Sequence, residues 1–260
     1  MAERVVVSID AGVADVRMCR VDKLNALDAE MFEALRDTGE RLAEDRSLRA
    51  VVLSGEGRAF CAGLDVSGLG GARNLFERRA GSPANLAQSA AWVWKALPVP
   101  VVAAIHGVAF GGGLQIALAA DIRFVTADAR MSVMEIKWGL VPDMTLSQTL
   151  PRLVALDVAK ELTFSGRIFS GAEAVELGVA THLSDQPREA ALELAREIAG
   201  KSPDAIRAGK RLLEECGDLG IEEALLLEEE LQRGVIGKPN QLESVKANME
   251  KRDPHFDHPS

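Results

Sequence analysis

Three consecutive glycines, Gly111 to Gly113, are the residues whose type and spacing are best suited to chemistry in this sequence. They stand between a run of small and β-branched apolar residues, Val99 to Ile105, and an apolar segment, Leu114 to Ala120. The first run predicts a buried strand and the second a buried helix. Glycines at a helix start let the backbone approach a ligand closely, with unpaired N–H groups pointing outward. Such a place suits an anion or an oxyanion that develops during a reaction.

A nucleotide phosphate could occupy a loop of the same kind, so the nucleotide motifs have to be compared. The chain contains no GxxxxGK[ST] sequence. A dinucleotide fingerprint requires a third glycine where this chain has Ile116, and the stretch lies in the middle of the chain. The sequence therefore favours an oxyanion over a nucleotide phosphate.

A second glycine-rich loop follows another predicted strand. The run RAVVLS, from Arg49 to Ser54, predicts a strand, and the sequence GEGRAFCAGLDVSGLGG continues it from Gly55 to Gly71. Binding and catalytic residues are often found on loops that a strand positions in this way. The chain therefore carries two candidate ligand-binding loops.

The bulk composition argues against several functional classes. The 260 residues carry a formal net charge of −9, which does not suit a nucleic-acid partner. The cysteines Cys19, Cys61 and Cys216 lie far apart without a CxxC or Cys/His cluster, so we expect reduced thiols, no metal and a cytoplasmic location. No signal-peptide pattern opens the chain, and its longest apolar run is too short to span a bilayer. We expect a soluble protein of enzyme size, without a membrane partner.

The elements that would position the two loops follow from periodicity and capping. Two short strands around Ala11-Gly12 predict a hairpin, and Lys23 to Leu27 predicts a loop. Asp28 is a candidate N-cap for the amphipathic helix that follows it. The residues expected on the buried face of that helix are Phe32, Leu35 and Leu42. Further predictions are a helix over about 84–97, strands over 121–125 and 131–133, and a helix over about 146–154.

Units of strand, strand and helix recur with similar size, which indicates a spiral of repeats instead of one doubly wound sheet. From Gly171 onward the chain changes to helices with Glu-rich outer faces, and we place a boundary near Lys201. It divides the chain into residues 1–200 and residues 201–260. The acidic run from Glu222 to Glu230 predicts a solvated face. The residues that form either an assembly surface or core contacts are Leu225, Leu226, Leu227 and Leu231.

Several motifs together resemble the crotonase superfamily, also called the enoyl-CoA hydratase/isomerase family. They are GRAFCAGLDV (57–66), HGVAFGGGLQIALAADIRFVTADARM (106–131), MEIKWGLVPD (134–143), KLNAL (23–27) and EKRDPHF (250–256). The resemblance spans nearly the whole chain. It implies an α/β (α+β) fold, a spiral of ββα units that forms two roughly perpendicular sheets in residues 1–200. It also implies that residues 201–260 form a helical region that trimerises, often as a dimer of trimers.

The resemblance also implies a substrate and the residues that hold it. The substrate would be an acyl thioester of coenzyme A, so no separate cofactor is expected. The thioester oxygen would accept hydrogen bonds from the backbone N–H groups of Leu64 and Gly112. Lys23 and Ala62 match positions near the pantetheine and adenine, and Phe256 matches an aromatic that covers the cofactor of a neighbouring subunit. The expected substrate-binding set is completed by Gly63, Asp65 and Gly111.

The first choice of reaction is hydration of a 2-enoyl-CoA. The family's hydratases hold one water between two glutamates, and these two positions fall on Glu135 and Gln115. Gln115 has no carboxylate that could accept or return a proton, so we expect it to line a wet cavity and to assist Glu135. Glu135 would then act as a lone base and acid, as in the hydroxycinnamoyl-CoA hydratase-lyases, which the string MEIKWG also resembles.

Asp143 supports a second choice, double-bond isomerisation. The spacing of Glu135 and Asp143 resembles that in dienoyl-CoA isomerases, whose acidic residues shuttle a proton, although their third carboxylate would fall on Gln115. The 4-chlorobenzoyl-CoA dehalogenases also have Asp here, but they carry Trp at the position of Glu135. Alternatively, Asp143 could simply cap the next helix. A third possibility, from a different class, is an acyl-CoA-binding protein that has lost hydratase activity.

Overall fold

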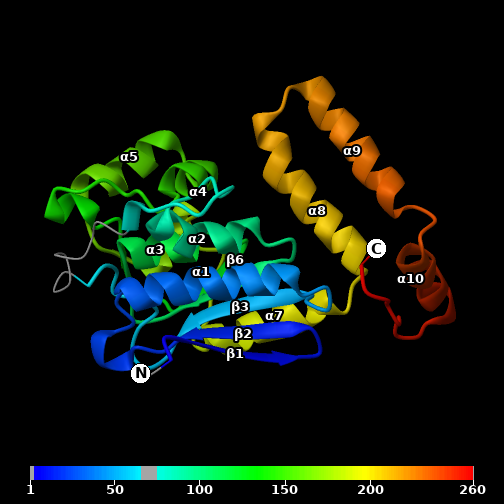
Figure 1. The fold of residues 1–260 in the computed structure, drawn as a ribbon, viewed down its shortest axis with the longest axis horizontal. Coiled ribbons are helices and arrows are strands. Elements are labelled where there is room, and N and C mark those ends of the chain that lie inside the picture. The colour runs from blue at the N-terminus through cyan, green and yellow to red at the C-terminus, as the bar shows by residue number, and fades with distance from the viewer. Residues whose placement is uncertain (1–2, 66–74, 260) are drawn as a thin grey trace.

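The structure, a computed structural model, describes residues 3–65 and 75–259. Residues 66–71 of the glycine-rich loop 55–71 therefore lie outside the described residues. A six-stranded sheet in the order β1-β2-β3-β4-β6-β9 forms the centre of the fold (Figure 1). Its first pair is antiparallel and its other pairs are parallel. The strands are β1 Val5–Asp10, β2 Val13–Met18, β3 Ala50–Gly55, β4 Val101–Ile105, β6 Ile122–Val125 and β9 His182–Leu183.

The N-terminal hairpin and the helix after it form where they were predicted. Ala11 and Gly12 make the turn between β1 and β2 with φ angles of 48° and 79°. Helix α1, Ala29–Glu44, begins after Asp28, whose side chain accepts a hydrogen bond from the Met31 N–H at 2.9 Å. The predicted apolar face of this helix is buried in the core. An N-cap of this kind is worth about 1 kcal/mol of helix stability.

The central strands of the six-stranded sheet are buried on both faces. Helices α1 and α2, Leu86–Ala96, pack together and contribute with Val51 and Leu53 of β3 to the large core cluster. The other face of the sheet packs against α7, Pro187–Ala199, in a smaller cluster that contains Val52 of β3 (Figure 1). Because successive strand residues point to opposite faces, a strand buried on both sides is apolar throughout. This is why the central strands read as continuous apolar runs.

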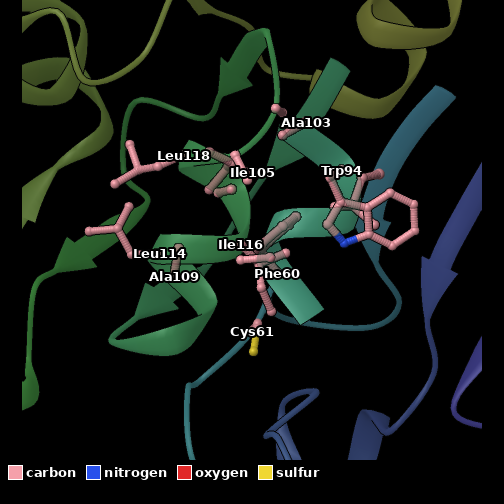
Figure 2. Packing of buried hydrophobic residues seen from close by; sticks show 14 of the residues in the cluster. Phe60, Cys61, Trp94, Ala103, Ile105, Ala109, Leu114, Ile116 and Leu118 are labelled. Carbon is pink, nitrogen blue, oxygen red and sulfur yellow. The ribbon is translucent and has the colours of Figure 1, made fainter. Parts of the chain in front are cut away.

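A second sheet, in the order β5-β7-β8, carries the glycine loop of residues 111–113. Its strands are β5 Val108–Phe110, β7 Arg130–Ser132 and β8 Phe169–Ser170. Strand β5 was not predicted, because three residues are too few to show a period. It leads directly into helix α3, Gly112–Leu118, which begins two residues before the predicted start. Figure 2 shows side chains of α3 packed with Ala109 of β5, Ile105 of β4 and Trp94 of α2.

The C-terminal helices project away from the sheet (Figure 1). Ion pairs connect α8 to the sheet-bearing part of the chain: Lys210 Nζ lies 2.8 Å from Asp121 Oδ2, and Glu214 pairs with Lys95. The remaining helices are η1 Val21–Lys23, η3 Glu135–Trp138, α4 Leu146–Leu153, α5 Leu156–Ser165, α6 Gly171–Leu177, α8 Pro203–Glu215, η4 Cys216–Asp218, α9 Ile221–Val235 and α10 Pro239–Glu250. Among residues 3–65 and 75–259, none of the helices is both long and apolar enough to cross a bilayer.

Candidate active site

Two backbone segments far apart in sequence are joined at the candidate site. The Cys61 N–H donates to Val108 O at 3.0 Å, and the Phe110 N–H donates to Cys61 O at 3.1 Å. These hydrogen bonds place the glycine-rich loop 55–71 beside the start of α3. The approach is close, since a Cβ built on Gly63 would lie 3.7 Å from the Gly112 nitrogen.

The backbone N–H groups of Leu64 and Gly112 have no hydrogen-bond acceptor among the described residues. Leu64 is held from both sides, because Gly63 O accepts from the Leu27 N–H at 2.8 Å and the Asp65 N–H donates to Leu27 O at 3.0 Å. Gly112 is the first residue of α3, where a backbone N–H lacks a partner within the helix. The structure thus presents two unused donors at one place.

Glycine is required at two positions here for steric reasons. Gly63 has a φ of +86°, and a Cβ on it would lie 2.5 Å from Phe110 O. Gly111 has a φ of +52°, and a Cβ on it would lie 3.2 Å from Glu135 Oε1. Non-glycine residues rarely adopt such φ angles. The two glycines therefore permit the close contact between the loops and the side chain of Glu135.

Leu64 and Gly112 both border a cavity of about 500 Å³. This volume lies in the range of small-molecule sites. Glu135 and Asp143 supply the only ionisable side chains among the described lining residues. The remaining described lining residues are Phe32, Ala62, Gly63, Leu75, Phe76, Ala87, Phe110, Gly111, Met134, Trp138, Leu140, Val141 and Met144.

Gln115 fixes the orientation of Glu135. The Gln115 Nε2 donates to Glu135 Oε1 at 2.6 Å, and Gln115 Oε1 accepts from the Met144 N–H at 2.8 Å. The second interaction determines which end of the amide faces Glu135. The other oxygen of Glu135, Oε2, is buried and has no hydrogen-bond partner among the described residues. One carboxylate oxygen is held by Gln115, and the other is buried without a described partner.

The pKa values of both carboxyl groups in the cavity are raised. Burial raises the pKa of Glu135 most, the Gln115 hydrogen bond lowers it, and the nearby charge of Asp143 raises it. Burial also raises the pKa of Asp143, although part of that side chain is open to solvent. A carboxyl group with a raised pKa is a better general acid and base near neutral pH.

The raised pKa of Glu135 has a consequence for stability. A group whose pKa is higher in the folded state stabilises the fold below its ordinary pKa of 4.5 and loses that contribution as the pH rises through the folded-state pKa. We therefore expect Glu135→Gln, which cannot ionise, to raise the Tm relative to the wild type at about pH 8 and much less at about pH 4. Differential scanning calorimetry at both pH values tests this. A Tm difference that does not change with pH would contradict it.

The structure corrects the expectation for Gln115 and excludes the capping alternative for Asp143. Gln115 is 1% exposed, binds two protein partners and is absent from the described lining residues, so it does not line a wet cavity. Helix α4 has Thr145 at its N-cap position and no side-chain cap. Asp143 instead borders the cavity.

The other residues predicted for the site are divided between the cavity and positions outside it. Ala62, Gly63 and Gly111 line the cavity. Asp65 does not, because its carboxylate pairs with Arg20 Nη2 at 2.7 Å. The predicted residues that lie outside the cavity lining of their own chain are Lys23, which is exposed at the end of η1, and Phe256, which is half-buried in the C-terminal tail.

Two residues that support the glycine-rich loop 55–71 were not predicted from the sequence. The Asn25 side chain is buried, and its Nδ2 donates to Ala59 O at 2.8 Å while its Oδ1 accepts from the Arg20 N–H at 2.8 Å. Arg20 also pairs with Asp65, next to Leu64. The signal was a polar residue inside the apolar context of KLNAL, which has to find partners when it is buried.

The remaining candidates for chemistry near the site are the Cys61 thiol and groups of side chains that could bind a metal ion. Burial raises the pKa of Cys61 to about 12, so this thiol, next to the lining residue Ala62, is inert. Within the described part of the chain, no group of three or more His, Cys, Asp or Glu side chains is placed to hold a metal ion.

Comparisons with known proteins extend over nearly the whole chain. Residues 8–259 match the family model for enoyl-CoA hydratase/isomerase. Mitochondrial methylglutaconyl-CoA hydratase from Mus musculus is 32% identical over 252 residues, which cover 94% of this chain and 79% of that protein. Mitochondrial Delta(3,5)-Delta(2,4)-dienoyl-CoA isomerase from Mus musculus is 32% identical over 262 residues, covering 95% and 82%. The crystal structure of an enoyl-CoA hydratase from Bacillus anthracis aligns with a TM-score of 0.87 at 29% identity, covering 97% of this chain and 98% of that chain.

Proposed function

Because the chain belongs to the enoyl-CoA hydratase/isomerase family and is an acyl-CoA hydratase/isomerase, we propose that it adds water to a 2-enoyl-CoA with Glu135 as its only proton-transfer residue. The observation that carries this proposal is the environment of Glu135. Gln115 holds one carboxylate oxygen, while Oε2 is buried at the cavity without a partner among the described residues. A water between Oε2 and a bound enoyl group would complete that arrangement.

Two backbone donors would stabilise the intermediate. Attack of water on C3 of an enoyl thioester moves negative charge onto the thioester oxygen and gives an enolate. The unused N–H groups of Leu64 and Gly112 are adjacent and border the same cavity as Glu135, which suits an oxyanion hole. Removal of one such donor typically costs about 3–4 kcal/mol of barrier. Because backbone atoms supply the hydrogen bonds, the apolar side chain of Leu64 does not prevent this role.

The proton balance requires only one carboxylate. Glu135 Oε2 accepts a proton from water as the water oxygen bonds to C3, and the protonated carboxyl then returns a proton to C2 of the enolate. The net change is the addition of one water. Gln115 cannot take part in the proton transfer, but its hydrogen bond to Oε1 keeps the carboxylate in place. The raised pKa of Glu135 favours both half-reactions near neutral pH.

Gln115 can be tested as a positioning residue. We expect Gln115→Met to lower kcat by about 10-fold to 100-fold with little change in KM, because Glu135 loses the contact that orients it. The same change leaves the buried Met144 N–H without an acceptor, which costs about 1–3 kcal/mol of stability. Gln115→Glu preserves that acceptor but places two carboxyl groups together, so the acidic limb of the pH–rate profile should move to higher pH. Equal kcat in the wild type and Gln115→Met would contradict the positioning role.

The reaction itself is tested with crotonyl-CoA and, in parallel, a 3,5-dienoyl-CoA. Loss of the conjugated thioester absorbance of crotonyl-CoA, with a product heavier by one water, supports hydration. Tight binding of both thioesters without turnover would instead support an acyl-CoA-binding protein.

Double-bond isomerisation is the second candidate, and the position of Asp143 favours it. Asp143 borders the same cavity as Glu135, its pKa is raised by burial, and it raises the pKa of Glu135. Two such carboxyl groups could remove a proton at one end of a diene and return one at the other. Conversion of the 3,5-dienoyl-CoA without a change of mass, lost in Asp143→Asn, would support this reaction.

We also propose that the chain assembles as a trimer or as a dimer of trimers. Large apolar side chains on α8, α9 and α10 are exposed, including Leu213 at 77%, Ile221 at 83% and Met249 at 80%. Exposed apolar surface of this extent is typical of an interface. Phe256 lies outside the cavity lining of its own chain, and we propose that it covers the coenzyme A of a neighbour. We also propose that Lys23 and Ala62 lie near the pantetheine and adenine of the substrate. Sedimentation equilibrium measures the assembly, and a monomer would contradict it.

A further inference from the structure

The described walls of the cavity are predominantly apolar and aromatic. Away from the two carboxyl groups, the described lining residues have apolar side chains or are glycines. Aromatic residues are prominent: the whole chain has 8 Phe, 3 Trp and no Tyr, and four of these eleven aromatic side chains border this one cavity. They are Phe32, Phe76, Phe110 and Trp138.

These aromatic residues come from different parts of the fold. Phe32 belongs to α1 and is 2% exposed, whereas Trp138 belongs to η3 and is 54% exposed. Phe76, at 68%, and Val141, at 74%, are also exposed. The cavity therefore extends from a buried apolar end to an exposed apolar rim. An uncharged acyl chain could stay in contact with apolar surface along this whole path.

The charged side chains among the described lining residues are all of one sign. Glu135 and Asp143 are acidic, and none of the described lining residues is Lys, Arg or His. Lys137 is the cation next to Trp138, with its Nζ 5.5 Å from the ring centre, but it is not a lining residue. A substrate carboxylate in this space would meet two acidic groups and apolar walls, and none of the described lining residues is a cation that could replace its lost hydration.

We propose that the cavity selects thioesters whose acyl group is uncharged and apolar, and rejects those whose acyl group ends in a carboxylate. This inference rests on the proposed function, because it describes the substrate of the same site. It adds the substrate class, which the reaction type alone leaves open.

The experiment uses three thioesters of matched shape: glutaconyl-CoA, its methyl ester and 5-methyl-2-hexenoyl-CoA. The first carries a terminal carboxylate, the second masks it, and the third replaces it with an isopropyl group. We expect kcat/KM for glutaconyl-CoA to be at least about 100-fold lower than for either neutral thioester. The saturated thioesters, glutaryl-CoA and its methyl ester, report binding without turnover, and we expect Kd for glutaryl-CoA to be at least about tenfold higher.

A charge variant tests the cause of the selectivity. Val141→Lys places a cation at the exposed rim, and we expect it to raise the ratio of kcat/KM for glutaconyl-CoA to that for its methyl ester by about tenfold or more. Val141→Met, of similar length and without charge, should leave that ratio where it is. A ratio that moves equally in both variants would contradict selection by charge.

The outcomes separate this proposal from the proposed function. Equal kcat/KM and equal Kd for the charged and neutral thioesters would overturn the substrate class and leave hydration intact. Discrimination in Kd without turnover of any thioester would support the substrate class and overturn the hydratase proposal. Efficient use of glutaconyl-CoA that Lys137→Met abolishes would also overturn the substrate class, since a cation would then serve the cavity.

Discussion

Glu135→Gln is expected to lower kcat/KM for hydration of a 2-enoyl-CoA by about 1,000-fold or more, because one residue performs both proton transfers. Thioester binding should persist, since the cavity walls and the donors at Leu64 and Gly112 are unchanged. The amide that replaces the carboxylate can still accept the hydrogen bond from Gln115. The measurements are kcat/KM by thioester absorbance and Kd by calorimetry with a saturated thioester.

Asp143→Asn is the matched control for Glu135→Gln. It removes the other carboxyl group of the same cavity, and hydration should depend on it far less than on Glu135. If Asp143→Asn lowers the rate as much as Glu135→Gln does, Glu135 is not the only carboxyl group that hydration requires. If Glu135→Gln retains most of the wild-type rate, Glu135 is not the proton-transfer residue.

Gly63→Ala is expected to lower kcat/KM by about 100-fold to 1,000-fold, which is the loss associated with one oxyanion donor. The new Cβ would lie 2.5 Å from Phe110 O, so the loop that carries Leu64 would have to move away from the start of α3. The φ of +86° adds strain of about 1–2 kcal/mol, so the Tm should fall as well. Activity is measured well below the Tm of the variant, so that the loss reflects the site and not unfolding.

Gly81→Ala separates backbone strain from displacement of the donors. Gly81 has a similar φ of +81°, but a Cβ there meets no atom within 4 Å. This variant should lower the Tm and leave kcat/KM at the wild-type value. If Gly63→Ala and Gly81→Ala have the same activity, the contact between Gly63 and Phe110 does not position an oxyanion donor.

Signals confined to neighbouring residues were sufficient for much of the fold. The turn at Ala11-Gly12, the Asp28 cap and the amphipathic helix after Asp28 were all predicted and confirmed, because each depends on a few adjacent side chains. Membership of the enoyl-CoA hydratase/isomerase family was also predicted from motifs and confirmed by the comparisons. These motifs place glycines where the backbone has to come close to a ligand or to another strand.

Contacts between distant residues could not be predicted in the same way. Strand β5 has three residues and exists through its pairing with β7. The pairing of Gln115 with Glu135 depends on where β7 and η3 place the glutamate, and its orientation depends on the Met144 N–H. The polar side chain of Gln115 in an apolar segment suggested that it lines a wet cavity. That prediction was wrong, because its hydrogen-bond partners come from segments 20 and 29 residues away in the sequence.

Several expectations stay predictions. They concern the trimeric or hexameric assembly, the boundary near Lys201, the cytoplasmic location, the lack of a cofactor and the roles of individual site residues. A test of the assembly and of the role of Phe256 requires a partner chain, because a residue that contacts a neighbour's ligand does not line the cavity of its own chain. The site roles need the kinetic variants described above.

The most direct test of the central claim is the mass of the product formed from crotonyl-CoA in ¹⁸O-labelled water. We predict a hydroxyacyl-CoA that is heavier by one water and carries the label on C3, formed by the wild type and not by Glu135→Gln. A thioester that binds and is recovered with unchanged mass would contradict the proposal that this site adds water through Glu135.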